Sequence, residues 1–341
     1  MKKNRQAVII TKNLAIGYRP RAHRAGIVVH KQLDLSLCKG EVTCLLGLNG
    51  AGKSTLLRTL CGFQPPLGGE ILLEGKALSR FSQRDFALKV GIILTERTNA
   101  GGLSVYELVS LGRHPYTGFF GHLNKQDHTV VRQAIEAVGM NHKAHNYVSE
   151  LSDGERQKAM IAKVLAQECP IVMLDEPTAF LDVSSRIETM ILLRDLARSQ
   201  GKTILLSTHD LELAIEMADR LWLQHKDKPM QEGTPEDLIL SGKLGHFFEK
   251  GKIHFNTYTG KLRTLPQGEL IQVKGDRLTL HWMYNALTRK GFRPQREDTG
   301  TIKKINCISP TEFELTLTAD KQYQTHSVEE TLALLNTSPM E

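Results

Sequence analysis

Residues 47–55 combine the residue types that a protein needs to hold a chain of phosphates. They read Gly-Leu-Asn-Gly-Ala-Gly-Lys-Ser-Thr and directly follow the apolar run 42–46. Glycines let the backbone curl so that its N–H groups point inward, and a helix beginning near Lys53 would direct the positive end of its dipole at the same point. Lys53 would reach the β- and γ-phosphates, and the Ser54 hydroxyl would ligate Mg²⁺. The spacing predicts a nucleoside triphosphate site formed by Gly47, Asn49, Gly50, Ala51, Gly52, Lys53, Ser54 and Thr55.

Two carboxylates end a second apolar run. Residues 171–174 read Ile-Val-Met-Leu and are followed by Asp175 and Glu176. In phosphoryl transfer the first carboxylate of such a pair can hold Mg²⁺ through water, while the second polarises the attacking water. His209 follows the β-rich run 203–207, and a side chain at that end of a parallel strand lies where open sheets bind ligands. Taken alone, His209 fits a ligand contact and a surface residue equally well.

The composition is that of an ordinary globular chain. It has 341 residues, of which 40% are hydrophobic and 24% charged, and this predicts one large domain and a smaller one. No apolar run approaches the roughly 20 residues that span a bilayer. The apolar stretch behind the basic N-terminus is too short for a secretion signal. We therefore expect the chain to stay in the cytoplasm.

Cysteine spacing and charge exclude further classes of protein. The five cysteines are odd in number and contain no C-x-x-C pair, so neither a disulfide framework nor a zinc site is predicted. The net charge of +7 could face nucleotide, lipid headgroups or nucleic acid, or be a modest excess on a soluble surface. Because the sequence has no aromatic-interleaved basic stripe, zinc-finger spacing or RNA-recognition signature, no nucleic acid partner is expected.

A third motif lies between the phosphate-binding residues and the carboxylates. Residues 151–157 read Leu-Ser-Asp-Gly-Glu-Arg-Gln, a polar turn ahead of a helix expected over 158–167. With these three motifs the chain resembles the ABC-type ATPases, which carry an L-S-G-G-Q-like signature just upstream of the second carboxylate motif. The resemblance covers about residues 7–264 and implies ATP and Mg²⁺ as cofactors. It also implies an α/β fold: a P-loop ATPase domain with a mixed sheet core, an antiparallel edge and an inserted helical subdomain.

The resemblance further implies how two copies of the chain would work together. In that family two ATPase domains close head to tail, so that the signature of one covers the nucleotide held by the other. The signature residues acting in trans would be Leu151, Ser152, Asp153, Gly154 and Glu155. The other implied roles are general base for Glu176, Mg²⁺ contact for Asp175, γ-phosphate sensor for His209, inter-subunit contact for Asp182 and adenine stacking for Tyr18.

The chain departs from the family pattern at two places. A glutamine that touches Mg²⁺ and relays the nucleotide state to the membrane partner is expected behind residues 90–94, where this sequence has Thr95 and Glu96. Either side chain could replace the metal contact, or neither, so this contact and the coupling stay open. The signature has Asp153 and Glu155 where glycine and glutamine are usual.

Two further stretches resemble a particular branch of the family. Residues 103–118 and 233–242 are similar to those of importer ATPases that energise uptake of ferric siderophores, haem or cobalamin. In these relatives the first stretch, here residues 105–116, receives a coupling helix of the permease. This implies a permease dimer as partner, a substrate-binding protein indirectly, and a peripheral place on the cytoplasmic side of the cell (inner) membrane.

Other interpretations of these stretches remain. Residues 112–118 also fit a solvated turn rich in glycine and proline. The alternatives for the whole chain are the ATPase of an exporter or lipid flippase, and a soluble ABC ATPase not engaged in transport. The stretch from Arg113 to Tyr116 favours import.

The remaining patterns predict the elements around the motifs. Strands over 7–16, 41–46 and 70–73 suggest the antiparallel edge, and runs 171–174 and 203–206 read as parallel core strands. Helical patterns supply the helical subdomain over 126–138 and 158–167. The predicted domains are an ATPase domain over 1–235 with its helical subdomain at about 96–165, a family-type segment and linker over 236–265, and a small α+β appendage over 266–341.

The C-terminal appendage lies beyond the resemblance. Its pattern predicts a βαββα unit made of strand 269–273, helix 278–290, strands 302–308 and 312–317, and helix 326–335. On the first of these helices His281, Trp282 and Tyr284 form either a ligand-binding face or part of the core, where such aromatic side chains are more often found. The appendage shows no catalytic constellation, and both cargo sensing and stabilisation of an ATPase dimer are open roles.

Overall fold

The chain divides into two compact units, each with its own hydrophobic core. The first comprises residues 1–247 and 257–261, and the second residues 248–256 and 262–341. The computed structural model describes residues 5–20, 26–94, 102–118, 121–226, 228–249, 251, 253–264, 268–297, 300, 301 and 303–336. Thr95 and Glu96 lie outside the described residues.

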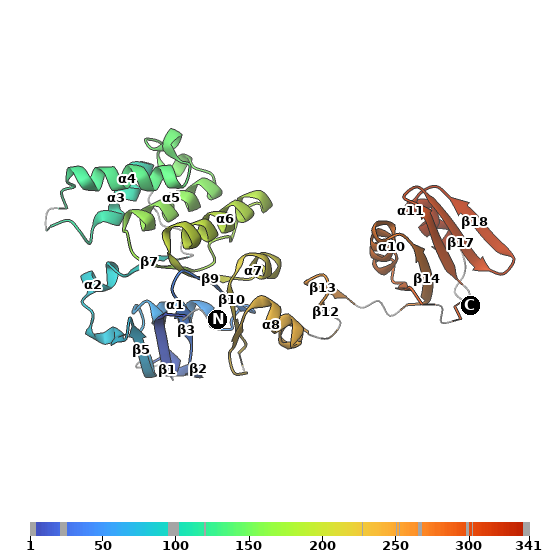
Figure 1. Cartoon of the computed structure of the whole chain (residues 1–341), viewed down its shortest axis with the longest axis horizontal. Coiled ribbons are helices and arrows are strands. Elements are labelled where there is room, and N and C mark those ends of the chain that lie inside the picture. Colours follow the sequence, from blue (N-terminus) through green and yellow to red (C-terminus); the bar gives the residue numbers. More distant parts are fainter. Residues whose placement is uncertain are drawn as a thin grey trace. The chain divides into compact units, whose positions relative to one another are not determined.

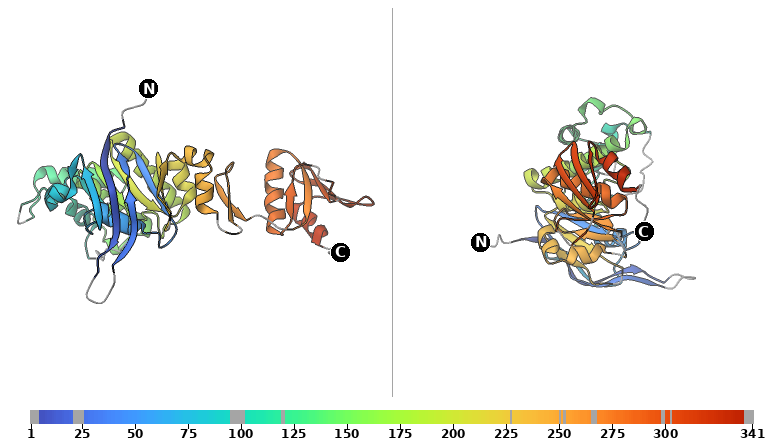
Figure 2. Two further views of the ribbon diagram at one scale, coloured as in Figure 1. Left: turned by 90° about the horizontal axis from the view of Figure 1, so that it is seen from below. Right: turned by 90° about the vertical axis from the view of Figure 1, so that its right-hand side faces the viewer.

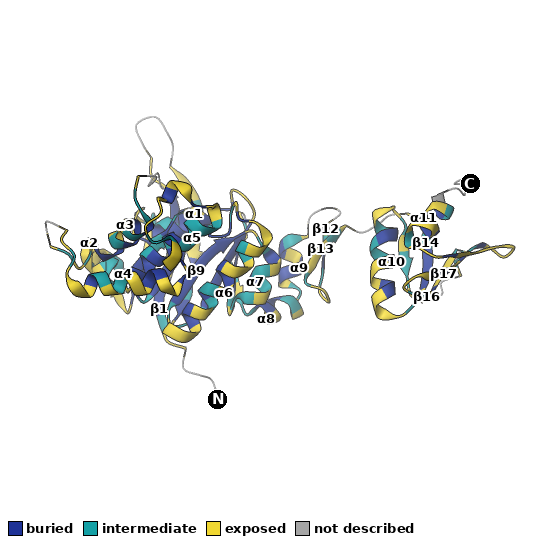
Figure 3. Ribbon diagram, turned by 90° about the horizontal axis from the view of Figure 1, so that it is seen from above, coloured by how far each residue is buried: buried dark blue, intermediate teal, exposed yellow. Residues whose placement is uncertain are grey.

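A six-stranded sheet organises the first unit (Figure 1). In spatial order its strands are β11 (Gln231–Gly233), β10 (Arg220–Gln224), β4 (Val42–Gly47), β9 (Thr203–Thr208), β8 (Ile171–Leu174) and β7 (Val90–Ile93). β11 runs antiparallel to its neighbour, and all other pairs are parallel. Every residue of β4, β8 and β9 is buried, because both faces of a parallel sheet are covered (Figure 3). The carboxyl ends of these three strands therefore meet at one edge of the sheet.

The first unit also contains a second, antiparallel sheet. It consists of β2 (Ile27–Leu33), β1 (Ala7–Tyr18), β5 (Gly68–Leu73) and β6 (Lys76–Ala77), with β3 (Ser36–Cys38) paired to β1. Figure 2 shows these strands side by side in blue. The prediction that residues 41–46 belong to this edge is wrong, because they form most of β4 in the parallel sheet. Residues 42–46 are apolar except for Thr43 and show no regular alternation of polar and apolar residues, and such a run is typical of a strand buried on both faces.

The helices up to residue 248 are α1 (Lys53–Leu60), α2 (Gln83–Ala87), α3 (Val105–Ser110), α4 (Lys125–Ala137), α5 (Asp153–Ala166), α6 (Val183–Gln200), α7 (Leu211–Met217), α8 (Pro235–Leu240) and α9 (Lys243–Phe248). Helices α1, α5, α6 and α7 contact strands of the parallel sheet, and α1 also contacts β1. Short 3-10 helices occur at Leu78–Arg80, Leu111–Arg113, Asn141–Lys143 and Val148–Glu150. No helix among the described residues combines the length and the apolar composition needed to cross a bilayer.

Helices α3, α4 and α5 pack against one another as a group (Figure 1). The sequence predicts that α5 begins at residue 158, but it begins at Asp153. Ser152 precedes the helix and accepts a hydrogen bond from the backbone N–H of Glu155, while the Glu155 carboxylate accepts one from the N–H of Ser152. This reciprocal capping box starts the helix one turn early. The polar signature is therefore the first turn of α5.

The second unit has a five-stranded sheet covered by two helices. In spatial order the strands are β15 (Arg293–Gln295), β14 (Leu270–Gly275), β16 (Lys304–Ser309), β17 (Glu312–Thr318) and β18 (Lys321–Thr325). The helices α10 (Arg277–Arg289) and α11 (Val328–Asn336) contact each other and this sheet. The predicted βαββα pattern omits β15 and β18, because β15 is three residues long and four of the five residues of β18 are exposed. A separate two-stranded sheet joins β12 (Ile253–Asn256) and β13 (Lys261–Thr264).

The aromatic residues of α10 do not all belong to the core. Trp282 is 60% exposed, and His281 is also exposed, whereas Tyr284 is half-buried. The buried face of the helix consists of Thr279, Leu280, Met283, Ala286 and Leu287. The interpretation of Trp282 as a core residue is therefore wrong.

We expect Leu287→Ala to destabilise the second unit and leave the first intact. Leu287 is fully buried in the second core, and truncating such a leucine costs about 2–5 kcal/mol of unfolding free energy. Thermal melting should show one transition lowered, while the other keeps its stabilisation by ATP. Leu278→Ala on the same helix is the control, since Leu278 is 63% exposed. An equal shift of both transitions would contradict separate folding of the two units.

Candidate functional site

The phosphate-binding residues lie where β4 leads into α1, at the carboxyl edge of the parallel sheet. Gly50 has a φ of 78° and Gly52 a φ of 96°, both in the left-handed region. A Cβ on Gly52 would lie 2.3 Å from Cγ1 of Val29, so no side chain fits there. No side chain caps α1, and the N–H groups of its first turn are therefore available to an anion. Ala51 is buried, whereas Asn49 is exposed.

Lys53 occupies the base of this loop. Its side chain is 6% exposed, and Nζ donates a hydrogen bond to the carbonyl of Gly47 at 2.9 Å. The same Nζ lies 3.5 Å from Oε1 of Glu176. Ser54, the next residue of α1, is exposed. A cradle of backbone N–H groups, an amino group and a carboxylate thus converge on one point.

Tyr18 lies at the end of β1, beside the same helix. Its hydroxyl is 3.1 Å from Oγ1 of Thr55 in α1. The residue is 51% exposed, and an exposed ring offers a face on which a nucleotide base can stack. The stacking role of Tyr18 stays a prediction.

Asp175 and Glu176 directly follow β8, and Ser207 on the neighbouring strand β9 links them. The Ser207 hydroxyl donates to Oδ1 of Asp175 at 2.6 Å and accepts the backbone N–H of Glu176 at 2.8 Å. Ser207 is fully buried, and Asp175 is 6% exposed. Glu176 has a φ of 50°, which marks a sharp turn of the chain at the strand end. The sequence analysis did not include Ser207 in the site; its one signal was its place at the end of an apolar run next to Thr208 and His209.

His209 completes the arrangement from the end of β9. Its Nδ1 lies 3.7 Å from Oε2 of Glu176, and its side chain is 56% exposed. The Glu176 carboxylate therefore lies between the Lys53 amino group and the His209 imidazole. The structure brings these three separately predicted residues together, and their catalytic roles stay predictions.

The signature residues Ser152 and Glu155 are hydrogen-bonded to each other at the start of α5. Leu151 before them is buried, and Ser152 is exposed. The Glu155 carboxylate also accepts a hydrogen bond from Nζ of Lys143 at 2.6 Å. Lys143 and the backbone N–H of Ser152 lower the pKa of Glu155. The unusual carboxylate thus has partners in its own chain.

Asp153 and Gly154 complete the signature. Asp153 pairs with Nη1 of Arg156 at 2.8 Å. A Cβ on Gly154 would lie 2.9 Å from Oγ of Ser185 in α6, so glycine permits the close approach of α5 and α6. In the part of the chain that the structure describes, no hydrogen bond or ion pair joins residues 151–155 to residues 47–55.

Asp182 caps the N-terminus of α6. Its carboxylate accepts the backbone N–H of Ser185 at 2.9 Å and the Ser185 hydroxyl at 2.8 Å, and these contacts lower its pKa. The residue is exposed, and its inter-subunit role stays a prediction. The suggested metal contacts of Thr95 and Glu96 lie outside the described residues.

Comparison with known proteins identifies the family. A family model described as ABC transporter matches residues 30–179, and one described as Iron ABC transporter C-terminal domain matches residues 267–336. The iron(3+)-hydroxamate import ATP-binding protein FhuC of Bacillus subtilis is 36% identical over 239 residues, which are 70% of this chain and 87% of that protein. The ferric enterobactin transport ATP-binding protein FepC of Escherichia coli is 37% identical over 211 residues, 62% of this chain and 78% of that protein.

A solved structure agrees in fold. The chain is similar to cbiO1 from Clostridium perfringens, part of the ABC transporter complex cbiONQ, with a TM-score of 0.60 and 26% identity. The match covers 70% of this chain and 93% of that one. The chain therefore belongs to the ATP-binding ATPases of the ABC transporter family and carries an iron ABC transporter C-terminal domain.

Proposed function

We propose that this chain hydrolyses ATP to drive an ABC importer of ferric siderophores. The observation that carries the proposed catalytic site is the position of the Glu176 carboxylate between Nζ of Lys53 and Nδ1 of His209. The cargo is supported by relatives whose names specify iron(3+)-hydroxamate and ferric enterobactin. The match of residues 267–336 to an iron transporter domain supports it independently.

Nucleotide binding is the first step that these residues would perform. The N–H groups around Gly52 and the first turn of α1 would hold the phosphates, and Tyr18 would stack on adenine. A bound Mg²⁺ would neutralise charge that develops on the β- and γ-phosphates, with Ser54 and Asp175 beside it. Among the described residues no group of three or more His, Cys, Asp and Glu could hold a metal. This fits an ion that keeps most of its ligands as phosphate and water oxygens.

Glu176 would act as the general base. Its side chain is 25% exposed, so water can reach it, and Lys53 holds it at the phosphate-binding loop. A phosphate that draws the Lys53 amino group to itself frees the carboxylate to accept a proton from water. His209, whose Nδ1 lies 3.7 Å from the same carboxylate, would sense the γ-phosphate.

Ser207 would hold the two acidic residues in fixed positions relative to each other. It fixes the side chain of Asp175 and the backbone of Glu176 through one buried hydroxyl. Because Ser207 lies on β9, which pairs with β8, displacement of the Asp175 carboxylate or of the Glu176 backbone relative to β9 would break one of these hydrogen bonds. We therefore assign Ser207 a positioning role in hydrolysis.

A second copy of the chain and a permease would complete the proposed transporter. In a head-to-tail dimer the first turn of α5 would cover the nucleotide of the other copy. Residues 105–116, which include α3, would receive the permease, and through it the chain would associate with the membrane as a peripheral subunit. Haem and cobalamin, the other expected cargoes, find no support in the names of the relatives cited above. The exporter and non-transport alternatives lack a specific observation in their favour.

We expect Glu176→Gln to bind ATP and remain in a closed dimer. The amide keeps the shape of the side chain but does not accept a proton, so hydrolysis should fall by at least about 100-fold. Light scattering after gel filtration with ATP should show a dimer that wild-type protein does not accumulate. Lys53→Ala in the Glu176→Gln background is the control and should stay monomeric. Substantial turnover by Glu176→Gln would refute its role as base.

Ser207→Ala should lower kcat while leaving the KM for ATP nearly unchanged. The substitution removes the donor that orients the Asp175 carboxylate and the partner of the Glu176 N–H. A loss of about 1–3 kcal/mol of this positioning energy in the transition state would lower kcat between about 5- and 150-fold. Steady-state ATPase assays measure both constants. Ser199→Ala, which removes an exposed helix serine bonded to the Asp195 carbonyl, should behave as wild type. An unchanged kcat for Ser207→Ala would remove Ser207 from the site.

Co-purification tests the importer assignment. Tagged Glu176→Gln protein, isolated with ATP from detergent-solubilised membranes of its own organism, should carry along a polytopic permease identifiable by mass spectrometry. Addition of a ferric siderophore to proteoliposomes containing that permease should then show uptake that depends on Lys53. Recovery of soluble partners alone would overturn the importer assignment.

A further inference from the structure

The segment 112–116 rests directly on the C-terminal end of α5. Gly112 allows the closest approach: a Cβ there would lie 2.1 Å from the carbonyl oxygen of Lys163 and 3.1 Å from Cβ of Ala166. Gly112 is buried, so backbone meets backbone without an intervening side chain. The segment and the helix end are therefore in direct contact.

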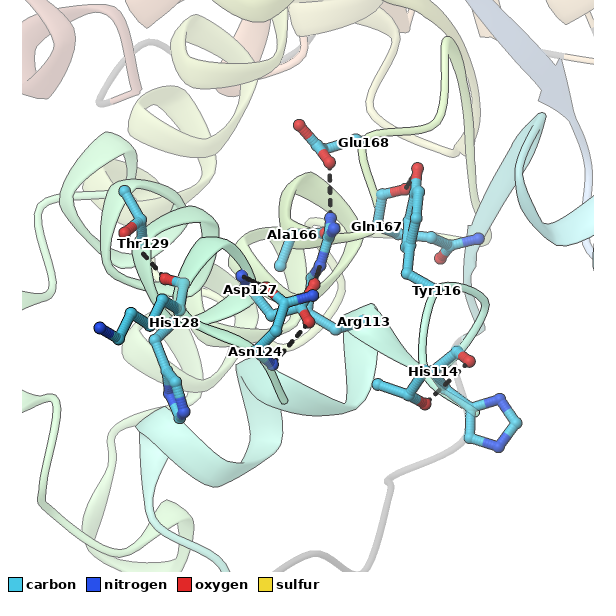
Figure 4. Close-up of polar contacts among 12 residues, drawn as sticks. Arg113, His114, Tyr116, Asn124, Asp127, His128, Thr129, Ala166, Gln167 and Glu168 are labelled. Carbon is cyan, nitrogen blue, oxygen red and sulfur yellow. Dashed lines mark hydrogen bonds and ion pairs between the residues drawn. The ribbon is translucent and has the colours of Figure 1, made fainter. Parts of the chain in front are cut away.

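Arg113 stabilises the contact between this segment and α5 (Figure 4). It is 3% exposed, and its Nη1 donates to the carbonyl of Ala166 at 2.7 Å and to Oε2 of Glu168 at 2.6 Å. Its Nε donates to Oδ1 of Asp127 in α4 at 2.8 Å. Burial acts to lower the pKa of Arg113, but the carboxylates of Glu168 and Asp127 outweigh it and raise that pKa. The guanidinium therefore stays charged in the interior.

Tyr116 adds a second contact to the same helix end. Its hydroxyl donates to the carbonyl of Gln167 at 3.1 Å, and its ring centroid lies 3.9 Å from the guanidinium carbon of Arg113. The last carbonyls of a helix lack partners within it and carry its negative dipole end. Arg113 and Tyr116 thus supply, from another segment, the donors and the positive charge that the end of α5 requires.

The opposite end of α5 carries the signature. Its 14 residues correspond to about 21 Å at 1.5 Å per residue, and a hydrogen-bonded helix transmits displacement along its axis. The C-terminal end is also tied to β7, because the Gln167 side chain donates to the carbonyl of Val90 at 3.1 Å. A shift of residues 112–116 that moves α5 as a rigid body would therefore also displace its first turn.

We propose that Arg113 is a positioning residue for the signature: by joining residues 112–116 to the end of α5, it sets where Ser152 and Gly154 stand when two copies close. This inference rests on the proposed function, because it takes the signature to act on the nucleotide of the second copy. Arg113 does not touch ATP, and its effect is confined to closure. The guanidinium is required because its fork serves Asp127, Glu168 and the Ala166 carbonyl together, whereas the single ammonium of lysine does not match this geometry.

Dimer formation by the full chain in the Glu176→Gln background tests this role. Arg113→Gln should weaken the ATP-dependent monomer–dimer equilibrium at least 10-fold by analytical ultracentrifugation, and Arg113→Lys should fall between it and the parent. The dissociation constant of a fluorescent ATP analogue, measured on dilute monomer, should change less than 2-fold. Thr129→Ala, at an exposed residue of α4 outside this segment, is the control and should dimerise as the parent does.

The outcomes separate this inference from the proposed function. Failure of the Glu176→Gln parent to dimerise would contradict the proposed function, whereas normal dimerisation of Arg113→Gln beside a dimerising parent would overturn the inference alone. A lower melting temperature with unchanged dimerisation would make Arg113 merely structural and also overturn it. If Arg113→Gln does not fold, Tyr116→Phe tests the inference in its place. This substitution removes only the hydroxyl bonded to Gln167 and should weaken dimerisation about 3-fold. Unchanged dimerisation of Tyr116→Phe and Arg113→Lys would then reject the inference.

Discussion

The burial of both faces of the three adjacent strands β4, β9 and β8 is the constraint on which the candidate site depends. β4, β9 and β8 are adjacent, parallel and wholly buried, so their polar continuations emerge together at one edge. Lys53, Glu176 and His209 each follow one of these strands. Although they are far apart in the sequence, their side chains lie close together at that edge. The buried hydroxyl of Ser207 then fixes the relative position of two neighbouring strand ends.

The sequence was sufficient to predict which residues meet at the strand ends where their position follows from local order. A glycine-rich turn that follows an apolar strand can be recognised without knowledge of the partner strands, and so can two carboxylates that follow another apolar strand. Ser207 escaped prediction because its hydrogen bonds join positions 31 and 32 residues away. The misplacement of residues 41–46 has a related cause, since a mostly apolar run without alternation does not reveal which strands flank it.

Helix and strand ends show the same limit. The start of α5 at Asp153 depends on the Ser152–Glu155 capping box, a signal present in the sequence but outweighed by the polarity of the turn. The carboxylates that distinguish this signature are each paired within the chain, Glu155 with Lys143 and Asp153 with Arg156. In the second unit, β15 and β18 lack apolar alternation and were predictable only from the strands they border.

The two tryptophans have a practical consequence. The chain contains two, Trp222 in the first unit and Trp282 in the second. Trp222 is completely buried in β10, whereas Trp282 is 60% exposed on α10. An indole shielded from solvent emits at shorter wavelength and resists ionic quenchers, while an exposed indole emits at longer wavelength and is quenched. Each unit thus contains one tryptophan, and the two tryptophans have distinct emission, so changes in either unit are observable in the unlabelled protein.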